Sequence, residues 1–282
     1  MQIHEIPLLR DPVAFFAFTG WNDAGEAASG TLSHLLRTWS DSSTLIAEID
    51  PEEFYDFQVN RPQVYVDASK IRRVTWPTTQ IWGLVTPTLP FDLVVITGAE
   101  PSMHWKQFSS EIIDLLDDLE VDLSIMLGSL LADTPHSRPI PVTGSGTHPE
   151  ISKKLGVEVS RYEGPTGILG VLQDAMIRRD IDAISMWAAI PHYASATPSP
   201  KASLALLNAI EDFLDISLPQ GDLPEAASAW EIAVNDLANE DSEISAYVKQ
   251  LEESKDAAEI PAATPESIAK EFERYLRHQD GN

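Results

Sequence analysis

The chain contains no cysteine among its 282 residues. This absence excludes disulfide bonds, thiolate nucleophiles and cysteine-ligated metal sites. Basic residues are scarce too, because 19 lysines and arginines stand against 44 aspartates and glutamates, a net charge of −25. An acidic surface repels phosphate backbones and anionic lipids, so we expect no nucleic-acid or membrane-surface binding. It would suit a partner with a basic face, although a solvated acidic surface is the more common explanation of such a charge.

Long apolar runs are missing as well. No stretch approaches the roughly 18 apolar residues of a membrane-spanning helix. Residues 1–7, MQIHEIP, lack the basic region and apolar core of a signal peptide. The apolar fraction of 43% still suits a globular protein with a sizeable core. The sequence therefore predicts a soluble, cytoplasmic protein.

Familiar catalytic motifs are absent. The sequence has no Walker loop, no G-x-G-x-x-G after a strand, no H-E-x-x-H and no G-x-S-x-G. Ser129, in LGSL, comes nearest to a nucleophile elbow but lacks the second glycine, so we interpret it as a small turn residue. None of the seven histidines stands at metal-ligand spacing, so we expect neither a metal site nor a cofactor.

Apolar runs of strand length alternate with helical patterns through residue 214. Such alternation is typical of an α/β fold with a mainly parallel sheet. The middle stretch, residues 44–97, has strands without intervening helices and predicts an antiparallel or mixed portion. The expected strands are 13–18, 45–49, 64–66, 80–85, 93–97, 123–127 and 183–189, and the expected helices are 103–119, 165–179 and 200–214. Ser199 and Pro200 predict the cap and first residue of the last helix.

The composition changes near residue 220. Residues 222–282 carry 15 acidic and 5 basic side chains and no strand pattern. Apolar stripes at 244–251 and 268–276 predict two or three amphipathic helices, with a disordered acidic tail as the alternative. We therefore expect an α/β core domain over 1–220 and an acidic helical extension over 221–282.

The stretch TGWNDAGEAASG, residues 19–30, joins the first long strand to a helix. Gly20 and Gly25 allow backbone geometry that a Cβ would block. Asn22 or Asp23 can cap the helix, since a side-chain oxygen accepts a free N–H of the first turn. We expect Trp21 to be buried. Ligands of α/β folds bind at such strand-to-helix turns.

Other polar residues follow later strands. Glu100 comes after strand 93–97, and His192 after strand 183–189. The segment EGPTGILG, 163–170, opens a helix whose free N–H groups could bind an anion, with Arg161 just upstream. A capped helix with closely packed glycines explains the same segment, and a loop-stabilising role explains His192 and His136.

An ordered set of seven motifs resembles the proteasome assembly chaperone 2 family, most closely its actinobacterial branch. The set runs through residues 13–215 and reads GWNDAGEAA at 20–28, DPEEFYDFQ at 50–58, RP at 61–62, WPTT at 76–79, GAEPS at 98–102, RYEGPTG at 161–167 and AAIPHY at 188–193. Each motif alone is weak, but seven in order make the resemblance specific.

The resemblance implies a three-layer α/β fold similar to nucleoside phosphorylases and related hydrolases. It also implies a protein that self-associates, with a trimer as one form. Eukaryotic relatives help to assemble proteasome α-rings, so proteasome subunits are the implied partners. Proteins of this class often dock through a C-terminal hydrophobic-Tyr-any motif, whereas Tyr275 stands seven residues before the last residue. We therefore expect no docking of that kind.

Two hypotheses follow. The first is a non-enzymatic, homo-oligomeric interaction or assembly factor. The second is an enzyme or sensor for a small anionic or nucleoside-like molecule bound at the strand-end loops. The residues predicted to form a pocket or interaction site are Gly20, Trp21, Asn22, Asp23, Glu100, Arg161, Glu163, Thr166, Gly167 and His192.

Overall fold

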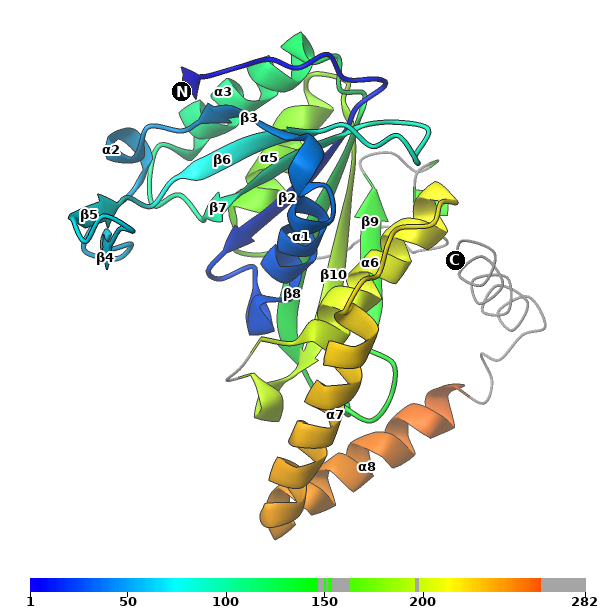
Figure 1. Ribbon diagram of the computed structural model, residues 1–282. Helices are drawn as coiled ribbons and strands as arrows, with labels where there is room; N and C mark the ends of the chain where they lie inside the picture. The colour runs from blue at the N-terminus through cyan, green and yellow to red at the C-terminus, as the bar shows by residue number, and fades with distance from the viewer. Residues whose placement is uncertain (147–149, 151, 154–162, 196–197, 260–282) are drawn as a thin grey trace. The chain divides into compact units, whose positions relative to one another are not determined.

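The computed structural model describes residues 1–146, 150, 152–153, 163–195 and 198–259 (Figure 1). These residues form two compact units. The first unit contains residues 1–23, 32–128 and 144–186, and the second contains 24–31, 129–143 and the described residues from 187 on. The turn highlighted by the sequence is divided between them, because Gly20–Asp23 belongs to the first unit and residues 24–30 to the second.

Most expected elements are present. The strands are β1 (Gln2–Ile3), β2 (Val13–Thr19), β3 (Ser43–Glu48), β4 (Gln63–Val66), β5 (Arg72–Thr75), β6 (Thr79–Leu84), β7 (Leu93–Ala99), β8 (Leu123–Ala132), β9 (Val142–Gly146) and β10 (Asp182–Pro191). The α-helices are α1 (Ala27–Thr38), α2 (Pro51–Phe54), α3 (Trp105–Asp118), α5 (Ile168–Ile177), α6 (Pro200–Leu214), α7 (Leu223–Glu240) and α8 (Ser242–Glu259), and short 3-10 turns lie at 24–26, 40–42 and 192–194.

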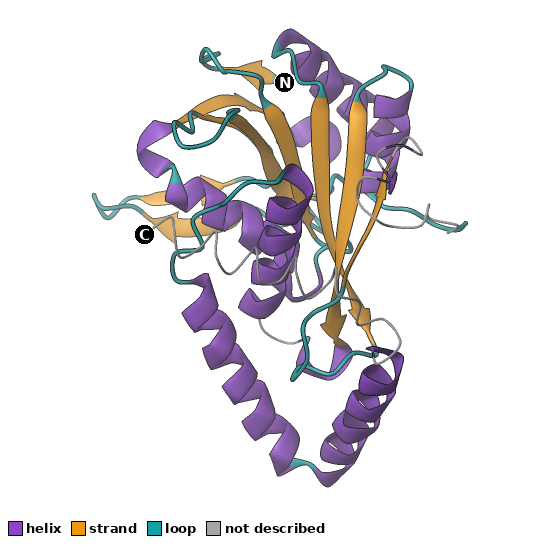
Figure 2. Ribbon diagram, turned by 90° about the vertical axis from the view of Figure 1, so that its right-hand side faces the viewer, coloured by secondary structure: helices purple, strands orange, loops and turns teal. Residues whose placement is uncertain are grey.

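Eight strands form one mixed sheet in the order β1-β3-β6-β7-β2-β8-β10-β9. Figure 2 draws the strands in orange and the helices in purple. The central strand β2 is parallel to both β7 and β8. The strands β1, β3, β6 and β7 pair antiparallel in that order, which confirms the mixed portion predicted for residues 44–97. The predicted α/β fold with a mixed sheet is therefore confirmed.

The core of the first unit is built from aromatic and branched side chains on both faces of the sheet. All residues of β2 except the last are buried, as a strand covered on both faces requires. The helices α3 and α5 pack together on one face, and residues 32–38 of α1 lie on the other (Figure 1). Phe108 of α3 meets Phe18 and Phe54 edge to face, with ring centroids 5.8 and 5.5 Å apart. The sheet and its two helical layers match the three-layer prediction.

Residues 64–66 form a strand as predicted, but not in this sheet. They belong to β4, which pairs with β5 alone, and every residue of both strands is exposed. The sequence pattern of β4, QVYV, marks a strand without indicating what covers it.

The second unit is mainly helical. In it α6 packs against α7, and α7 against α8. The start of α1 is joined to the start of α6, because Ser199 N–H donates to the Gly25 carbonyl (2.7 Å) and Ser203 Oγ donates to the Ala27 carbonyl (2.9 Å). Ser199 occupies the predicted cap position and Pro200 the first turn, but the prediction of a side-chain cap is wrong. Ser199 Oγ is buried and has no hydrogen-bond partner.

The helices α7 and α8 confirm the predicted amphipathic helices after residue 222, including the stripe at 244–251. The stripe at 268–276 lies outside the described residues, and the domain boundary at residue 220 stays a prediction. Among the residues that the structure describes, no helix is both long and apolar enough to span a membrane.

Candidate functional site

The first predicted site residues lie in the turn that follows β2. Gly20 has a φ of +126°, a backbone conformation that side chains with a Cβ rarely adopt. The turn closes with a hydrogen bond from Asp23 N–H to the Gly20 carbonyl (3.2 Å). It buries Asn22 and Asp23, whose residues are 1% and 7% exposed. Trp21, in contrast, is 69% exposed, so the prediction that it is buried is wrong.

Glu100 connects this turn to the helix α5. Its oxygen Oε1 accepts hydrogen bonds from Asn22 Nδ2 (2.7 Å) and from the backbone N–H of Ile168, the first residue of α5 (2.8 Å). The backbone N–H of Glu100 donates to the Thr19 carbonyl at the end of β2 (2.9 Å). Asn22 therefore binds Glu100 and does not cap α1, which begins only after a separate 3-10 turn.

Gly167 is the residue that makes this cluster compact. A Cβ on Gly167 would lie 2.5 Å from the terminal atoms of the Asn22 side chain and 2.8 Å from Glu100 Oε1. Both distances are shorter than any normal contact, so the close approach depends on glycine. We refer to Asn22, Glu100, Gly167 and Ile168 as the Glu100 cluster.

The cluster changes the interpretation of the 163–170 segment. The free N–H groups and the dipole of a helix N-terminus favour an anion. In this structure the carboxylate of Glu100 takes that place at α5. An anionic ligand would have to displace Glu100 or lie next to its negative charge, and both cost free energy.

The other predicted residues lie around or away from this cluster. Glu163 and Thr166 are exposed on the approach to α5, and Arg161 lies outside the described residues. His192 belongs to the second unit, where its Nδ1 lies 3.3 Å from Asp133 Oδ1 and its ring meets Tyr193 and Tyr247 edge to face. The structure therefore brings together Asn22, Glu100 and Gly167, but does not add His192 to them.

A cavity of about 430 Å³ opens beside α3 and α5 within the first unit. It is lined by Lys106, Ser109, Thr166, Gly170, Val171, Asp174, Ala175 and Arg178. Arg178 forms an ion pair with Asp174, and the buried Ser109 Oγ has no hydrogen-bond partner. Among the described residues, no group of three or more His, Asp or Glu side chains could hold a metal ion.

Ser129 has a structural role. It is fully buried and its hydroxyl donates to the Ala24 carbonyl (2.8 Å). The hydroxyl therefore stabilises the turn before α1. Ser129 itself lies inside β8, so its interpretation as a turn residue is wrong.

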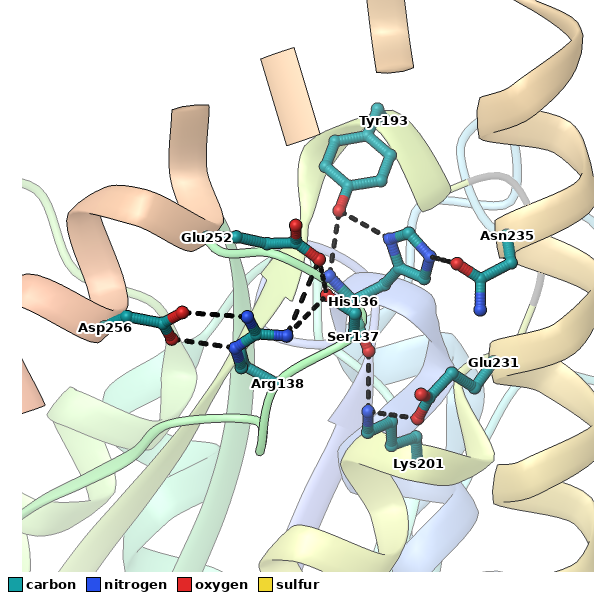
Figure 3. A network of polar contacts seen from close by, with 9 residues as sticks. All are labelled: His136, Ser137, Arg138, Tyr193, Lys201, Glu231, Asn235, Glu252 and Asp256. Carbon is teal, nitrogen blue, oxygen red and sulfur yellow. Dashed lines mark hydrogen bonds and ion pairs between the residues drawn. The ribbon is translucent and has the colours of Figure 1, made fainter. Parts of the chain in front are cut away.

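A second group of polar residues, centred on His136, lies in the second unit (Figure 3). His136 is 1% exposed, and its Nε2 lies 3.0 Å from Asn235 Oδ1 on α7. The Tyr193 hydroxyl lies 2.8 Å from both the Nδ1 and the backbone N of His136. Because Asn235 Oδ1 can only accept, Nε2 carries the proton, and Nδ1 accepts from Tyr193.

The neighbours of His136 hold the loop 133–139 to three helices. Arg138 forms a bidentate ion pair with Asp256 of α8, with both N–O distances 2.8 Å. The hydroxyl of Ser137 donates to Glu252. Lys201 of α6 binds both the His136 carbonyl (2.6 Å) and Glu231 of α7. Every polar group of this set contacts another protein group, which indicates a structural network.

Burial sets the protonation of this network. Desolvation lowers the pKa of His136 from its usual 6.5, and this outweighs the opposite effects of the Asn235 hydrogen bond and of Glu231 and Glu252. Burial also raises the pKa of Tyr193 to about 12. Near neutral pH both side chains are therefore uncharged, as the hydrogen-bond pattern requires.

We predict that Glu100→Ala lowers the free energy of unfolding by about 2–4 kcal/mol, because it leaves Asn22 Nδ2 and the Ile168 N–H without their acceptor. Glu100→Gln keeps a carbonyl oxygen in place, so we expect a loss of about 1 kcal/mol. Urea denaturation measures both. The control is Glu163→Ala, an exposed neighbour expected to stay within about 0.5 kcal/mol of wild type. Equal stability of the two alanine variants would contradict the role of the cluster.

We also predict that acid weakens the His136 network. A buried histidine with a lowered pKa stays neutral in the folded protein while the unfolded chain gains a proton. The His136 contribution to stability is therefore fully present above pH 6.5 and is lost as the pH falls from 6.5 towards the folded pKa. Chemical denaturation between pH 8 and 5 should show a smaller decrease for His136→Gln than for wild type. Parallel curves would contradict this account.

Comparison with known proteins identifies the family. The model of the PAC2 family matches residues 17–238. The crystal structure of a PAC2 family protein from Streptomyces avermitilis is 48% identical, with a TM-score of 0.78, and the match covers 84% of this chain and all of that one. No curated protein matches the chain.

Two further solved structures extend the comparison. A Mycobacterium tuberculosis proteasome-assembly chaperone homologue is 44% identical, with a TM-score of 0.75 and coverage of 84% and 99% of the two chains. PbaB, an archaeal proteasome activator from Pyrococcus furiosus, has a TM-score of 0.64 over 83% of this chain and 96% of its own. At 18% identity that match shows a shared fold. The family model and the two closely similar structures together show that this chain belongs to the PAC2 family.

Proposed function

We propose that this PAC2 protein is a non-enzymatic interaction and assembly factor that acts as a homo-oligomer. The observation that carries the proposal is its 44% identity, over almost the whole of that chain, to the Mycobacterium tuberculosis proteasome-assembly chaperone homologue. Proteasome subunits are accordingly the proposed partners. The cytoplasm is the proposed compartment, in keeping with a chain that contains no cysteine.

The chemistry of the strand-end loops supports this proposal. A general base or nucleophile must be able to reach a substrate. The Glu100 oxygen that contacts Asn22 instead accepts two hydrogen bonds from within the protein, and the Ser129 hydroxyl is buried against the Ala24 carbonyl. His136 uses both ring nitrogens in protein contacts. These side chains therefore stabilise loops.

The proposal predicts that the purified protein forms a complex of defined size at micromolar concentration. It also predicts that the protein binds purified actinobacterial proteasome α-subunits and changes the rate at which α- and β-subunits assemble. Mass photometry measures the first property, and native gels of an assembly time course measure the second.

An unrelated protein of similar net charge is the matched control, because it separates specific binding from acidic-surface effects. A strict monomer would contradict the homo-oligomer, and unchanged assembly kinetics would contradict the choice of partner.

A second candidate function is a ligand sensor, and one observation favours it. The cavity beside α3 and α5 places Lys106 and Thr166 on one small space, together with the unpartnered hydroxyl of Ser109. Cationic and hydroxyl groups of this kind suit a phosphate or another small anion.

This candidate predicts that inorganic phosphate or a nucleoside monophosphate at millimolar concentration raises the melting temperature of the protein, since a ligand of the folded state stabilises it by mass action. Lys106→Ala should abolish the rise. A melting temperature that stays constant in wild type, at fixed ionic strength, would contradict the sensor.

A further inference from the structure

The segment 57–76, which we call the hairpin segment, is exposed along both of its strands. Its strands β4 and β5 pair antiparallel, with Val64 opposite Val74 and Val66 opposite Arg72. Asp67 fixes the turn, because its Oδ1 accepts from the N–H groups of Ser69 and Ile71 (both 2.9 Å). Figure 1 shows the hairpin at the far left, beyond the ends of β6 and β7.

One face of this hairpin is apolar and exposed. Residues that alternate along a strand, and those directly opposite, point to the same face. Val64, Val66 and Val74 therefore share a face, and they are 53%, 63% and 50% exposed. Val59 (74%), Ile71 (50%) and Trp76 (45%) add exposed apolar area to the same segment.

A two-stranded hairpin has only marginal stability in water unless another surface covers it. Apolar patches of this kind mark sites of protein contact. A partner surface that fits these valines must also match the charge of the segment.

The hairpin segment has the opposite charge to the rest of the chain. It contains four basic residues, Arg61, Lys70, Arg72 and Arg73, and one acidic residue, Asp67. The remaining residues carry 15 basic and 43 acidic side chains. An acidic partner surface would therefore attract the segment. Nucleic acid is disfavoured, because the remainder of each molecule would repel it.

A second copy of this chain supplies such an acidic surface on α7. The outward side of α7 exposes Ile232 (60%). The exposed carboxylates of Asp236 and Glu240 follow Ile232 by four and eight residues, so the three side chains form one stripe along the helix. This helix side thus combines apolar area with negative charge, as the hairpin combines apolar area with positive charge.

A contact between two copies of the hairpin would be less favourable. It would bring two segments of net positive charge together, and like charges at an interface cost free energy. A contact of one surface with a different surface of the neighbour avoids this, and it can close into a ring.

We propose that the hairpin segment of one molecule docks on the outward side of α7 of a second copy. The valines of β4 and β5 cover Ile232, while Arg61 and Arg72 lie next to Asp236 and Glu240. This inference rests on the proposed function, because it requires a protein that self-associates. It adds the two surfaces that make the contact.

The test is a charge exchange followed by sedimentation velocity over a range of concentrations. The double variant Arg61→Glu/Arg72→Glu should weaken self-association about hundredfold, because it places like charges together. Adding Asp236→Lys and Glu240→Lys in the same chain should restore association to within about tenfold of wild type. Val64→Thr/Val74→Thr keeps the β-branched shape of both side chains and should weaken association about tenfold through lost apolar contact.

The matched control is Arg37→Glu/Lys249→Glu, which changes the net charge equally at exposed positions elsewhere and should leave association unchanged. Circular dichroism checks that every variant is folded. If wild type associates and the hairpin variants associate equally well, this inference is overturned while the proposed function stands. Dissociation without rescue overturns the assignment to α7, and a monomeric wild type overturns both proposals.

Discussion

The hydrogen bonds of one carboxylate, that of Glu100, join three segments that are far apart in the sequence. This side chain stands just after β7, binds Asn22 in the turn after β2, and caps the first N–H of α5. The parallel pairing of β2 with β7 brings the first two segments to the same edge of the sheet, since parallel strands end on the same side. Gly167 then allows α5 to approach within hydrogen-bond distance. These hydrogen bonds connect the loops at the strand ends to one another.

This bonding within the protein explains why the most informative stretch of the sequence, residues 19–30, does not mark a catalytic centre. The stretch 19–30 has the residues of a ligand-binding turn, but Asn22 Nδ2 is bonded to Glu100, while the buried Asn22 Oδ1 has no hydrogen-bond partner. Residues 24–30 belong to the unit that contains the start of α6. The features that favour contact with a partner lie on the surface instead, where the hairpin segment is basic and apolar while the rest of the chain is acidic.

The sequence predicted the sheet and the helices well, because their signals are local. The continuous apolar run of β2 and the 3.6-residue spacing of α3 depend on neighbouring residues alone. It also selected Asn22, Glu100 and Gly167, since each lies next to a strand or helix end. It could not show that they bond one another, because Asn22 and Glu100 are 78 positions apart. The partners of His136 were missed for the same reason, and the exposure of Trp21 and β4 depends on packing that no local pattern encodes.

The central claim is that the outer surfaces make the contacts of this protein and that the strand-end turn stabilises the fold. Hydrogen–deuterium exchange of wild type, compared between dilute and concentrated samples, tests it directly. The account predicts that association slows exchange in peptides covering residues 57–76 and 223–240 and leaves residues 19–23 and 163–168 unchanged. Slower exchange at residues 19–23 and 163–168, with no change at the hairpin or α7, would contradict it.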